Sequence, residues 1–554
     1  MHRLHCRGDI LGVISRIDGR GYKAYRDLLG ACGEAGGLLV RVARVQGDPF
    51  APPSVVAVEA PTDRVPREAL KWPVPLADWL HRRLYSALRR RSRRVGEGHS
   101  GLLAVPRPGP VILRRSSVEV RGGRITFRVW AGLPSRGRRI LGGEARRMLL
   151  EAIPAAVSEV LGEASRGPRG LWEHIHAWRL QETLRAQLRP RGLVAFVGDG
   201  SILPRRCGGC EDPLPGAVPF ESPPSLRVEL EGPGGESVTG MGVRRGVTVI
   251  AGSAFHGKTT LLEAIAAGVW DHVPGDGRER VVTVRNAMYV QAEDGRFISC
   301  VDVSPMIHDL PGGEDTRCFS TENASGATST AAAIQEAVEA GAELVLLDED
   351  TAASNILYSD ERARGLTRWH TVTPLASLAR SMAERGVSLV IVSSGSLPLL
   401  AVADTVIVME AYKPRDATSH ARELAARYGV EVPQAGYRPP RPRLVGSTPR
   451  LVKPKIRAWR LEDKALPASV DLRRDLHLVE EGQLNTVLLI VRDHLPRARG
   501  RILSEWLREI EGIIAEGGPQ ALASGEPGPS LSEVRGLDVA FAVNRLPGLS
   551  ARQP

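Results

Sequence analysis

The sequence predicts an α/β fold in which a parallel sheet carries a nucleotide site at one edge. The first observation is the apolar, strand-like run Val247–Ala251, followed by a glycine-containing loop at 252–259 and the helix-forming run Leu261–Ile265. The second is the mostly apolar run Ala342–Leu347, which ends in two carboxylates. Such a run is typical of a buried parallel strand, and ligands of α/β folds bind at the carboxyl ends of these strands.

Residues 252–259, Gly-Ser-Ala-Phe-His-Gly-Lys-Thr, have the composition and spacing of a phosphate-binding loop. Its glycines let backbone N–H groups turn toward phosphate oxygens, while Lys258 reaches the β- and γ-phosphates and the Thr259 hydroxyl can ligate Mg²⁺. The chain has only seven lysines, which makes a chance match rare. ATP and Mg²⁺ are therefore the expected ligands. The loop residues expected to bind ATP are Gly252, Ser253, Ala254, Phe255, His256, Gly257, Lys258, Thr259 and Thr260.

Asp348 and Glu349 stand where the metal chemistry of such a site needs carboxylates. We expect Asp348 to hold Mg²⁺ directly or through water, and Glu349 to polarise the attacking water. Lys258 is the third residue of this catalytic set. An ordinary strand capped by solvated acids is the alternative, which the position of both acids about 90 residues after Lys258 disfavours.

A third segment, Glu322–Thr330, places the small-residue turn Ser325–Gly326 before the helix-forming run Ala331–Ala340. A helix N-terminus can face phosphate oxygens, although clusters of serine, glycine and threonine are usually only helix caps. Its position shortly before Asp348 favours a role in nucleotide binding for Ser325 and Gly326.

Together these motifs resemble the family described as predicted ATPases of the ABC class. The resemblance implies an ABC-type P-loop ATPase core flanked by an α+β N-terminal domain and a small C-terminal domain. In ABC ATPases a turn like Ser325–Gly326 meets the γ-phosphate held by a second subunit. One loop and one such turn per chain therefore imply a head-to-tail homodimer with two composite sites. Further similar runs lie at 16–25, 45–50, 133–138, 196–205, 291–296, 310–313 and 347–355, so that the resemblance covers most of residues 10–480.

Two positions depart from transporter-type ABC domains or leave a choice open. No histidine follows the strand-like run Val387–Val392, which leads into a glycine–serine turn, and Ser396 is our candidate γ-phosphate sensor there. The Mg²⁺-sensing residue between the two main motifs is usually glutamine in ABC proteins. Both Gln291 and Glu293 follow the strand-like run Ala287–Val290. The resemblance, which centres on Ala-Glu-Asp-Gly-Arg, favours Glu293 as the metal-binding residue.

Length and composition predict several domains with cores of their own, since the 554 residues are 42% apolar and 25% charged. Two proline-rich stretches suggest the boundaries. We expect a basic N-terminal domain at 1–212, a linker at 213–226, the ATPase core at 227–435, and a C-terminal domain and tail at 436–554.

The sequence predicts a cytoplasmic protein without a membrane partner. No apolar run approaches the roughly 18 residues of a membrane span, and residues 1–9 lack the apolar segment of a signal peptide. Six cysteines are too few for a disulfide scaffold in a chain of this size. Cys207 and Cys210 have metal-ligand spacing, but without a second ligand pair a disulfide is favoured over zinc.

Positive charge is concentrated in the arginine-rich region, residues 63–147. It contains twenty arginines and one lysine against six acidic residues, a net charge of +15, whereas the whole chain carries +11. Arginines near aromatic residues suit phosphate contacts and base stacking, so we expect nucleic acid to bind here, RNA ahead of DNA. The alternative is an ordinary solvated surface. The candidate residues are Arg89, Arg90, Arg91, Arg93 and Arg94.

These observations predict an ATPase of the ABC class that hydrolyses ATP at composite sites of a homodimer and binds nucleic acid through its N-terminal domain. The alternative is a nucleotide-gated protein clamp or scaffold, with slow hydrolysis and no nucleic-acid ligand. A transporter ATPase ranks third because of the long N-terminal extension. Salt-sensitive RNA binding would separate the first two functions.

Overall fold

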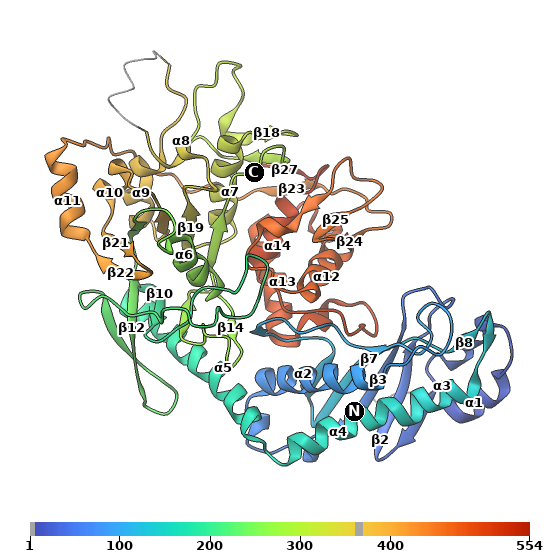
Figure 1. The fold of residues 1–554 in the computed structure, drawn as a ribbon. Helices are drawn as coiled ribbons and strands as arrows, with labels where there is room; N and C mark the ends of the chain where they lie inside the picture. The colour runs from blue at the N-terminus through green and yellow to red at the C-terminus, as the bar shows by residue number, and fades with distance from the viewer. Residues whose placement is uncertain (1–5, 360–368) are drawn as a thin grey trace. The chain divides into compact units, whose positions relative to one another are not determined.

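The computed structural model describes residues 6–359 and 369–554 (Figure 1). The chain divides into two compact units, which are described separately. The boundary between them at His176 and Ala177 falls within helix α5 (Arg169–Leu188). The first unit comprises Met1–His176, Glu480–Thr486 and Ile513–Glu533, and the second comprises Ala177–Val479, Val487–Gly512 and Val534–Pro554.

The first unit is built on an antiparallel sheet with the strand order β1-β2-β3-β7-β4, in which β6 also pairs with β7. Alternate residues of β2, Leu38, Val40 and Val42, are buried, as expected for a strand with one face on the core. The strands are β1 (Cys32–Ala35), β2 (Leu38–Arg44), β3 (Ser54–Pro61), β4 (Leu103–Ala104), β6 (Val118–Arg121) and β7 (Arg124–Ala131). The helices are α1 (Ile10–Ile17), α2 (Pro73–Arg91), α3 (Gly142–Arg147) and α4 (Ile153–Ser165).

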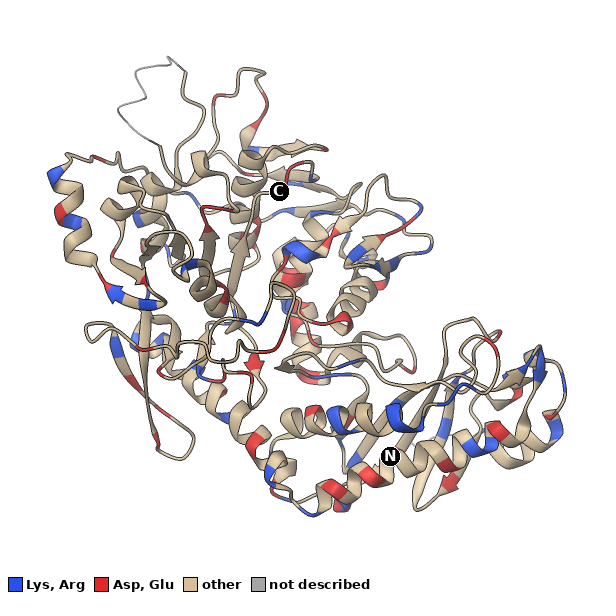
Figure 2. Cartoon of the chain, viewed as in Figure 1, with Lys and Arg blue, Asp and Glu red and all other residues tan. Residues whose placement is uncertain are grey.

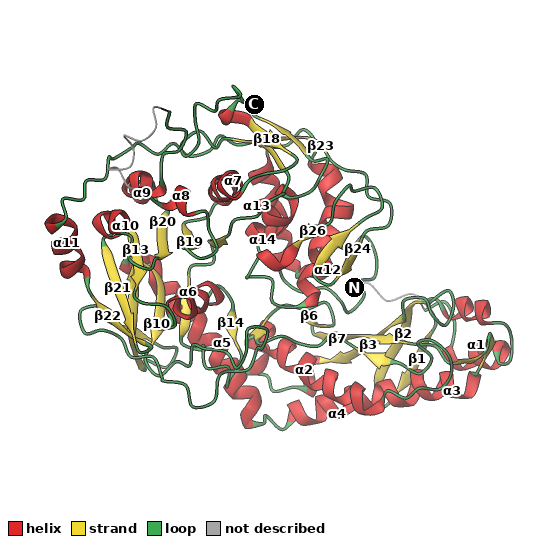
Figure 3. Ribbon diagram, turned by 45° about the horizontal axis from the view of Figure 1, so that its top comes forward, coloured by secondary structure: helices red, strands yellow, loops and turns green. Residues whose placement is uncertain are grey.

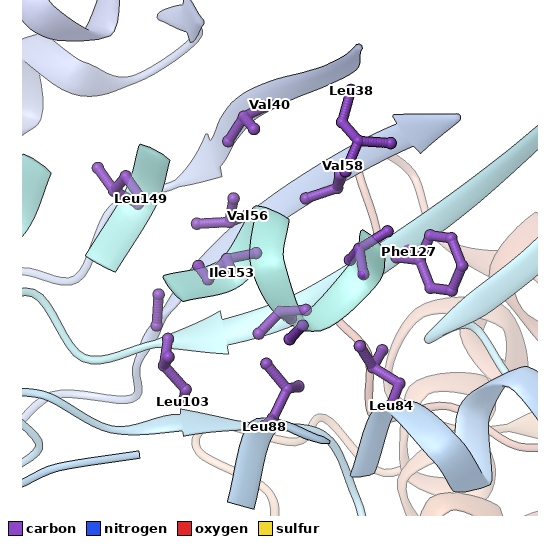
Figure 4. Packing of buried hydrophobic residues seen from close by; sticks show 14 of the residues in the cluster. Leu38, Val40, Val56, Val58, Leu84, Leu88, Leu103, Phe127, Leu149 and Ile153 are labelled. Atoms are coloured by element: carbon purple, nitrogen blue, oxygen red, sulfur yellow. The ribbon is translucent and has the colours of Figure 1, made fainter. Parts of the chain in front are cut away.

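Helix α2 supplies much of the core of this unit. Pro73 begins the helix, at a position whose backbone N–H is not needed for helical hydrogen bonds. Leucines recur at every fourth position along one face, and all of them are buried. Figure 4 shows two of them, Leu84 and Leu88, packed with Val56, Phe127 and Ile153 of the surrounding strands and of α4. The four leucines are Leu76, Leu80, Leu84 and Leu88.

The second unit contains a mainly parallel sheet with the strand order β16-β19-β20-β13-β21-β22, and β22 is its antiparallel edge strand (Figure 3). This order places β19 on one side of β13 and the hairpin β21–β22 on the other. The strands are β13 (Val247–Ala251), β16 (Ala287–Val290), β19 (Leu344–Asp348), β20 (Ser388–Val392), β21 (Thr405–Glu410) and β22 (Lys413–Asp416). The helices of this part are α6 (Lys258–Ala267), α7 (Gly326–Glu339), α8 (Ser354–Leu357), α9 (Leu375–Glu384), α10 (Leu397–Val402) and α11 (Thr418–Arg427).

The second unit also contains an antiparallel sheet with the order β11-β12-β10-β15, and helix α6 packs against strands of both sheets. Strand β10 pairs with β12, although the proline-rich stretch 213–226 lies between them in the chain. That stretch is therefore a loop inside the second unit, and this division differs from the predicted boundaries. The strands are β10 (Leu193–Gly198), β11 (Arg227–Glu231), β12 (Ser237–Arg244) and β15 (Val281–Thr283).

The predicted C-terminal domain also divides differently, because Glu480–Thr486 and Ile513–Glu533 group with the first unit and the other residues from 436 onward with the second. Helix α13 begins at Leu503 in this part of the chain. Further elements are β17 (Ile298–Val301), β18 (Phe319–Thr321), β23 (Leu444–Ser447), β24 (Lys455–Arg457), β25 (Arg460–Glu462), β26 (Val470–Asp471), β27 (Ser550–Arg552), α12 (Glu481–Leu489), α13 (Leu503–Gly517) and α14 (Gly536–Asn544).

All six cysteines form disulfides. Cys207 pairs with Cys210, as the sequence favours. The other two pairs, Cys6–Cys32 and Cys300–Cys318, were not predicted, because partners 26 and 18 residues apart leave no local pattern. Within the part of the chain that the structure describes, no helix has the length and apolar character needed to cross a membrane.

Candidate active site

The loop at 252–257 connects β13 to α6, in the strand–loop–helix order that the sequence predicts. Gly252 has a φ of +130°, and a Cβ there would lie 2.6 Å from the Met409 carbonyl oxygen, so no larger residue fits. The Lys258 ammonium group donates a hydrogen bond to the Ser253 carbonyl at 2.8 Å, across the loop. Ser253 and Ala254 are exposed, while Thr260 is half-buried in the first turn of α6.

Thr259 and Asp348 meet at the carboxyl edge of the parallel sheet. The Thr259 hydroxyl, in the first turn of α6, donates to Oδ2 of Asp348 at 2.7 Å. Asp348 is the last residue of β19 and is buried. Mg²⁺ is usually held by one or two protein oxygens together with phosphates and water. This hydroxyl–carboxylate pair fits that ligand set.

Glu349, the next residue, is held by two hydrogen bonds. The backbone N–H of Ser394 donates to its Oε2 at 2.7 Å, and the Tyr358 hydroxyl donates to its Oε1 at 2.5 Å. Burial raises the pKa of Glu349, but the hydrogen bonds from Tyr358 and Ser394 outweigh it and hold this pKa below its ordinary value. The bond to Glu349 also raises the pKa of Tyr358 to about 12. An ionised, oriented carboxylate can position water and accept its proton.

Neither hydrogen-bond partner of Glu349 was predicted from the sequence. Ser394 contributes a backbone N–H, which is independent of its side chain and leaves no signal in the sequence. Tyr358 follows the short helix α8, nine residues after Glu349, outside any recognised motif. A tyrosine at that distance could be found only once the turn after β19 is known.

Gln291, rather than Glu293, lies at the strand end beside the carboxylates. Strand β16 pairs with β19 in the register Val290↔Leu347, so Gln291 and Asp348 are the next residues on neighbouring parallel strands. The Glu293 carboxylate is occupied by Arg545, whose Nε lies 2.9 Å from Oε2. Burial raises the pKa of Glu293, but the Arg545 charge outweighs it and lowers this pKa. The geometry therefore does not support the preference for Glu293 as the metal-binding residue.

Ser325 caps helix α7. Its hydroxyl accepts a hydrogen bond from Thr328 N at 3.2 Å, and the residue is exposed, with the half-buried Gly326 beginning the helix. One turn later, Thr330 Oγ1 accepts a hydrogen bond from Ala353 N at 3.3 Å. Helix α7 is thereby joined to the loop that follows Glu349.

Ser396 lies in the turn after β20, where Ser394 contacts Glu349. Its backbone N–H donates to Ser393 Oγ at 3.0 Å. Its own hydroxyl oxygen is buried and has no hydrogen-bond partner among the described residues. The contact to Glu349 thus comes from Ser394, and the role of Ser396 stays a prediction.

Two family models match the chain. The model of the ABC ATPase P-loop domain matches residues 168–439, and the model described as the N-terminal part of ATPases of the ABC class matches residues 8–164. The chain belongs to the ABC-class ATPase family. The two matched ranges together contain the loop, both carboxylates, the Ser325 turn and the arginine-rich region.

Individual proteins are similar to only part of the chain. An uncharacterised protein of Methanocaldococcus jannaschii is 34% identical to this ABC-class ATPase over 272 residues, which are 46% of the chain and 58% of that protein, less than two thirds of its length. The ATP-binding cassette of an ABC transporter, solved in its ADP conformation, is 11% identical, with 37% of this chain and 95% of that chain covered and a TM-score of 0.23. A component of an ABC transporter complex of Clostridium perfringens is 16% identical, with 43% of this chain and 93% of that chain covered and a TM-score of 0.25.

The five candidate arginines of this ABC-class ATPase differ in their partners. Arg89–Arg91 form the last turn of α2, where the helix dipole favours basic residues. Arg90 and Arg91 both pair with Glu159 of α4. The other three, Arg89, Arg93 and Arg94, are exposed and have no ion pair with any described residue.

Other arginines of residues 63–147 lie inside the first unit. Arg115 is 2% exposed and pairs with Asp78 and Glu480. Arg128 pairs with Glu119 and Glu526. Figure 2 shows acidic residues in red interspersed with the basic residues in blue over these elements. Carboxylates from outside the arginine-rich region therefore neutralise part of its charge.

Proposed function

We propose that the chain hydrolyses ATP with Mg²⁺ at the loop 252–260. The loop and Lys258 would bind the phosphates, Thr259 and Asp348 would hold Mg²⁺, and Glu349 would polarise the attacking water. The observation that carries the proposal is the 2.7 Å contact between Thr259 and Asp348, with an oriented, ionised Glu349 as the next residue. When bound, Mg²⁺ would neutralise developing charge on the phosphate oxygens.

Each residue has a defined task in this proposal. Lys258 contributes positive charge at the β- and γ-phosphates, where charge develops during transfer. Glu349 orients the water and accepts its proton, while Tyr358 and Ser394 fix the direction of its carboxylate. Gln291 is the better candidate than Glu293 for contacting the metal or the water, because it follows β16 directly, next to Asp348. Arg545 holds the Glu293 carboxylate, while Arg474 donates to the amide oxygen of Gln291 at 3.2 Å.

We further infer that two copies share their sites. Ser325 and Gly326 would contact the γ-phosphate bound to the loop of a second copy, with Ser396 beside it in the same copy as the loop. The exposure of Ser325 at the start of α7 supports this arrangement. Through the hydrogen bond between Thr330 and Ala353, a displacement of α7 on nucleotide contact would move the loop that follows Glu349.

The N-terminal region is the proposed nucleic-acid site, for RNA ahead of DNA. Support comes from Arg89, Arg93 and Arg94, which have no ion pair with any described residue, and from a cavity of about 280 Å³ whose lining includes Arg90, Arg91, Arg93 and Arg147. The internal ion pairs of Arg115 and Arg128 reduce the charge available to phosphates. They favour the second candidate, a nucleotide-gated protein clamp without a nucleic-acid ligand.

Phosphate release tests the ATPase proposal, and ATP-dependent compaction tests the shared sites. The wild-type protein should release phosphate from ATP only with Mg²⁺, and Lys258→Ala should lose ATP affinity. Small-angle scattering should show ATP compacting Glu349→Gln, whereas Glu349→Gln combined with Ser325→Arg should bind ATP without compaction. Compaction of both proteins would argue against shared sites, and Mg²⁺-independent release would argue against the metal role of Thr259 and Asp348.

A further inference from the structure

The outer edge of strand β16 is covered by side chains from the C-terminal part of the second unit, which have no task in the chemistry proposed above. Strand β16 is an edge strand of the parallel sheet, so one of its edges faces away from β19. On that edge the Ala287 carbonyl accepts a hydrogen bond from Arg535 at 2.8 Å. Two residues later, the backbone N–H of Tyr289 donates to Nε2 of His477 at 3.1 Å. These side chains satisfy backbone groups that another strand would otherwise bind.

The segment that carries His477 is fixed in place. His477 is 1% exposed, and its carbonyl accepts a hydrogen bond from Trp270 Nε1 at 2.7 Å. Its backbone N–H donates to Oδ1 of Asp475 at 3.0 Å, and Asp475 is buried as well. Arg474, the residue before Asp475, is exposed. The buried residues therefore hold the backbone of Arg474 near the end of β16, while its side chain is free to move.

Arg474 contacts the side chain of Gln291, the first residue after β16. Its guanidinium group donates to the amide oxygen of Gln291 at 3.2 Å. Its carbonyl oxygen lies 3.5 Å from Gln291 Nε2, at the outer limit of a hydrogen bond. The amide oxygen is the atom through which Gln291 would contact Mg²⁺, because carbonyl and carboxylate oxygens suit this ion and the amide nitrogen is only a donor. Arg474 thus engages the atom that the metal would use.

The Arg474 side chain also has space to leave Gln291. Arg474 forms no ion pair with any described residue, so its contact with the amide oxygen is not reinforced by a carboxylate. It lines a cavity of about 460 Å³ in the second unit. The exposed carboxylates of Asp294 and Glu322 line the same cavity and attract a cation that turns toward them. The contact with Gln291 can therefore open without displacing packed residues.

We infer that Arg474 is a positioning residue that competes with Mg²⁺ for the amide oxygen of Gln291. The inference rests on the proposed binding of ATP with Mg²⁺ and adds a control of the metal site to it. An amide oxygen has two lone pairs. A Mg²⁺ ion on the second lone pair would lie within roughly 5 Å of the guanidinium nitrogen, and the two cations repel each other. Gln291 therefore contacts either Arg474 or the metal, and Arg474 turns toward the cavity when the metal binds.

Binding of Mn²⁺, as a substitute for Mg²⁺, tests this competition without turnover. With the Glu349→Gln protein in excess over ATP, electron paramagnetic resonance of free Mn²⁺ measures the affinity of the metal for the protein–nucleotide complex. Adding Arg474→Ala should raise this affinity roughly 2- to 10-fold, the effect of losing one hydrogen bond. Arg474→Lys keeps a cationic donor and should raise the affinity less. The control is Arg473→Ala, which removes the neighbouring exposed arginine, a partner of Asp471, and should leave the affinity unchanged.

Gln291→Ala distinguishes competition for the oxygen from the general effect of a nearby charge. It should weaken Mn²⁺ binding, and Arg474→Ala should then cause no further change. An equal gain in affinity from Arg474→Ala with and without Gln291 would overturn the competition, because the charge would then act without the amide. Unchanged Mn²⁺ affinity in Arg474→Ala would overturn it too. A Glu349→Gln protein that binds ATP but no Mn²⁺ would instead overturn the metal site of the proposed function.

Discussion

The phosphate-binding loop and the arginine-rich region obtain their electrostatic partners in different ways. Lys258 donates to Ser253, five residues away across the loop. Thr259 donates to Asp348 at the end of β19, which belongs to the same sheet as β13, the strand before the loop. In the arginine-rich region, by contrast, Arg115 and Arg128 pair with carboxylates 365 and 398 residues later in the chain. The charges of the loop stay available for a ligand, while these two arginines are neutralised inside the fold.

The net charge of a segment therefore predicts its surface charge only when the segment contains its own counter-charges. The +15 of residues 63–147 does not include Glu159, Glu480 or Glu526, which belong to the same compact unit. The charge of the phosphate-binding loop does not depend on counter-charges from distant segments in this way. Lys258 donates within the loop, and Thr259 donates to Asp348 at the end of one strand.

The largest effect is expected at the loop. Glu349→Gln removes the group that accepts the proton of water and should lower ATP turnover by about 10²- to 10⁴-fold, while ATP still binds. Phosphate release measures turnover, and calorimetry measures binding. Glu384→Gln, which neutralises an exposed carboxylate at the end of α9, should leave both unchanged. A turnover for Glu349→Gln close to that of the wild-type protein would remove Glu349 from this role.

The next effect concerns the buried partners of the arginine-rich region. Glu480→Gln leaves Arg115 with less counter-charge in a buried site, and breaking such a pair costs about 3–5 kcal/mol of the free energy of unfolding. Urea unfolding should show this loss. Glu68→Gln, which breaks the exposed pair with Lys71, should cost less than about 1 kcal/mol. Equal losses in the free energy of unfolding for the two substitutions would show that the buried pair stabilises the fold no more than the exposed pair.

The same residue gives that prediction a pH dependence. Burial raises the pKa of Glu480, but the charge of Arg115 outweighs it, so the pKa in the folded state lies below the ordinary value. The stabilisation from this carboxylate is thus present above the unfolded pKa of about 4.3. It is lost as the pH falls through the folded pKa. The difference in unfolding free energy between wild type and Glu480→Gln should therefore shrink under acid conditions.

Local patterns in the sequence predict the centre of the candidate site but not the residues around it. β13, α6 and the placement of Asp348 beside Thr259 follow from short motifs. The resemblance of the Ala-Glu-Asp-Gly-Arg run favoured Glu293 over Gln291. The sequence contains no sign of Arg545, which lies 252 residues later and occupies the Glu293 carboxylate.

The compact units divide the chain differently from the domains predicted from the prolines, for a similar reason. Prolines indicate a break in regular structure, and at 213–226 they do lie outside helices and strands. They do not indicate whether the chain returns to the same sheet afterwards. It does so here, because β12 pairs with β10 across that stretch.

A smaller effect tests whether the unpaired arginines carry the nucleic-acid function. Replacing Arg89, Arg93 and Arg94 with glutamine should lower the slope of log affinity against log salt concentration by about 2, at roughly 0.7 for each phosphate contact. The double variant Arg90→Gln and Arg91→Gln should change it less, since Glu159 already pairs with both. Anisotropy of a labelled single-stranded RNA over a range of KCl concentrations measures the slope. Salt-insensitive binding would instead favour the protein clamp.

The smallest effect concerns Tyr358, which would act on the reaction through its hydrogen bond to Glu349. Its pKa of about 12 keeps the hydroxyl protonated at neutral pH, so it donates to Glu349 and lowers the pKa of that carboxylate. Tyr358→Phe removes one hydrogen bond, worth about 1 kcal/mol, and should lower kcat at pH 7 by roughly fivefold. Glu349 should then take up a proton at higher pH, so the loss of kcat on acidification begins at higher pH than in the wild type. A kcat profile that extends below the ordinary glutamate pKa of about 4.3 tests this shift. A uniform decrease in kcat with an unchanged acidic limb would mean that Tyr358 only supports the fold around α8 and does not set the ionisation of Glu349.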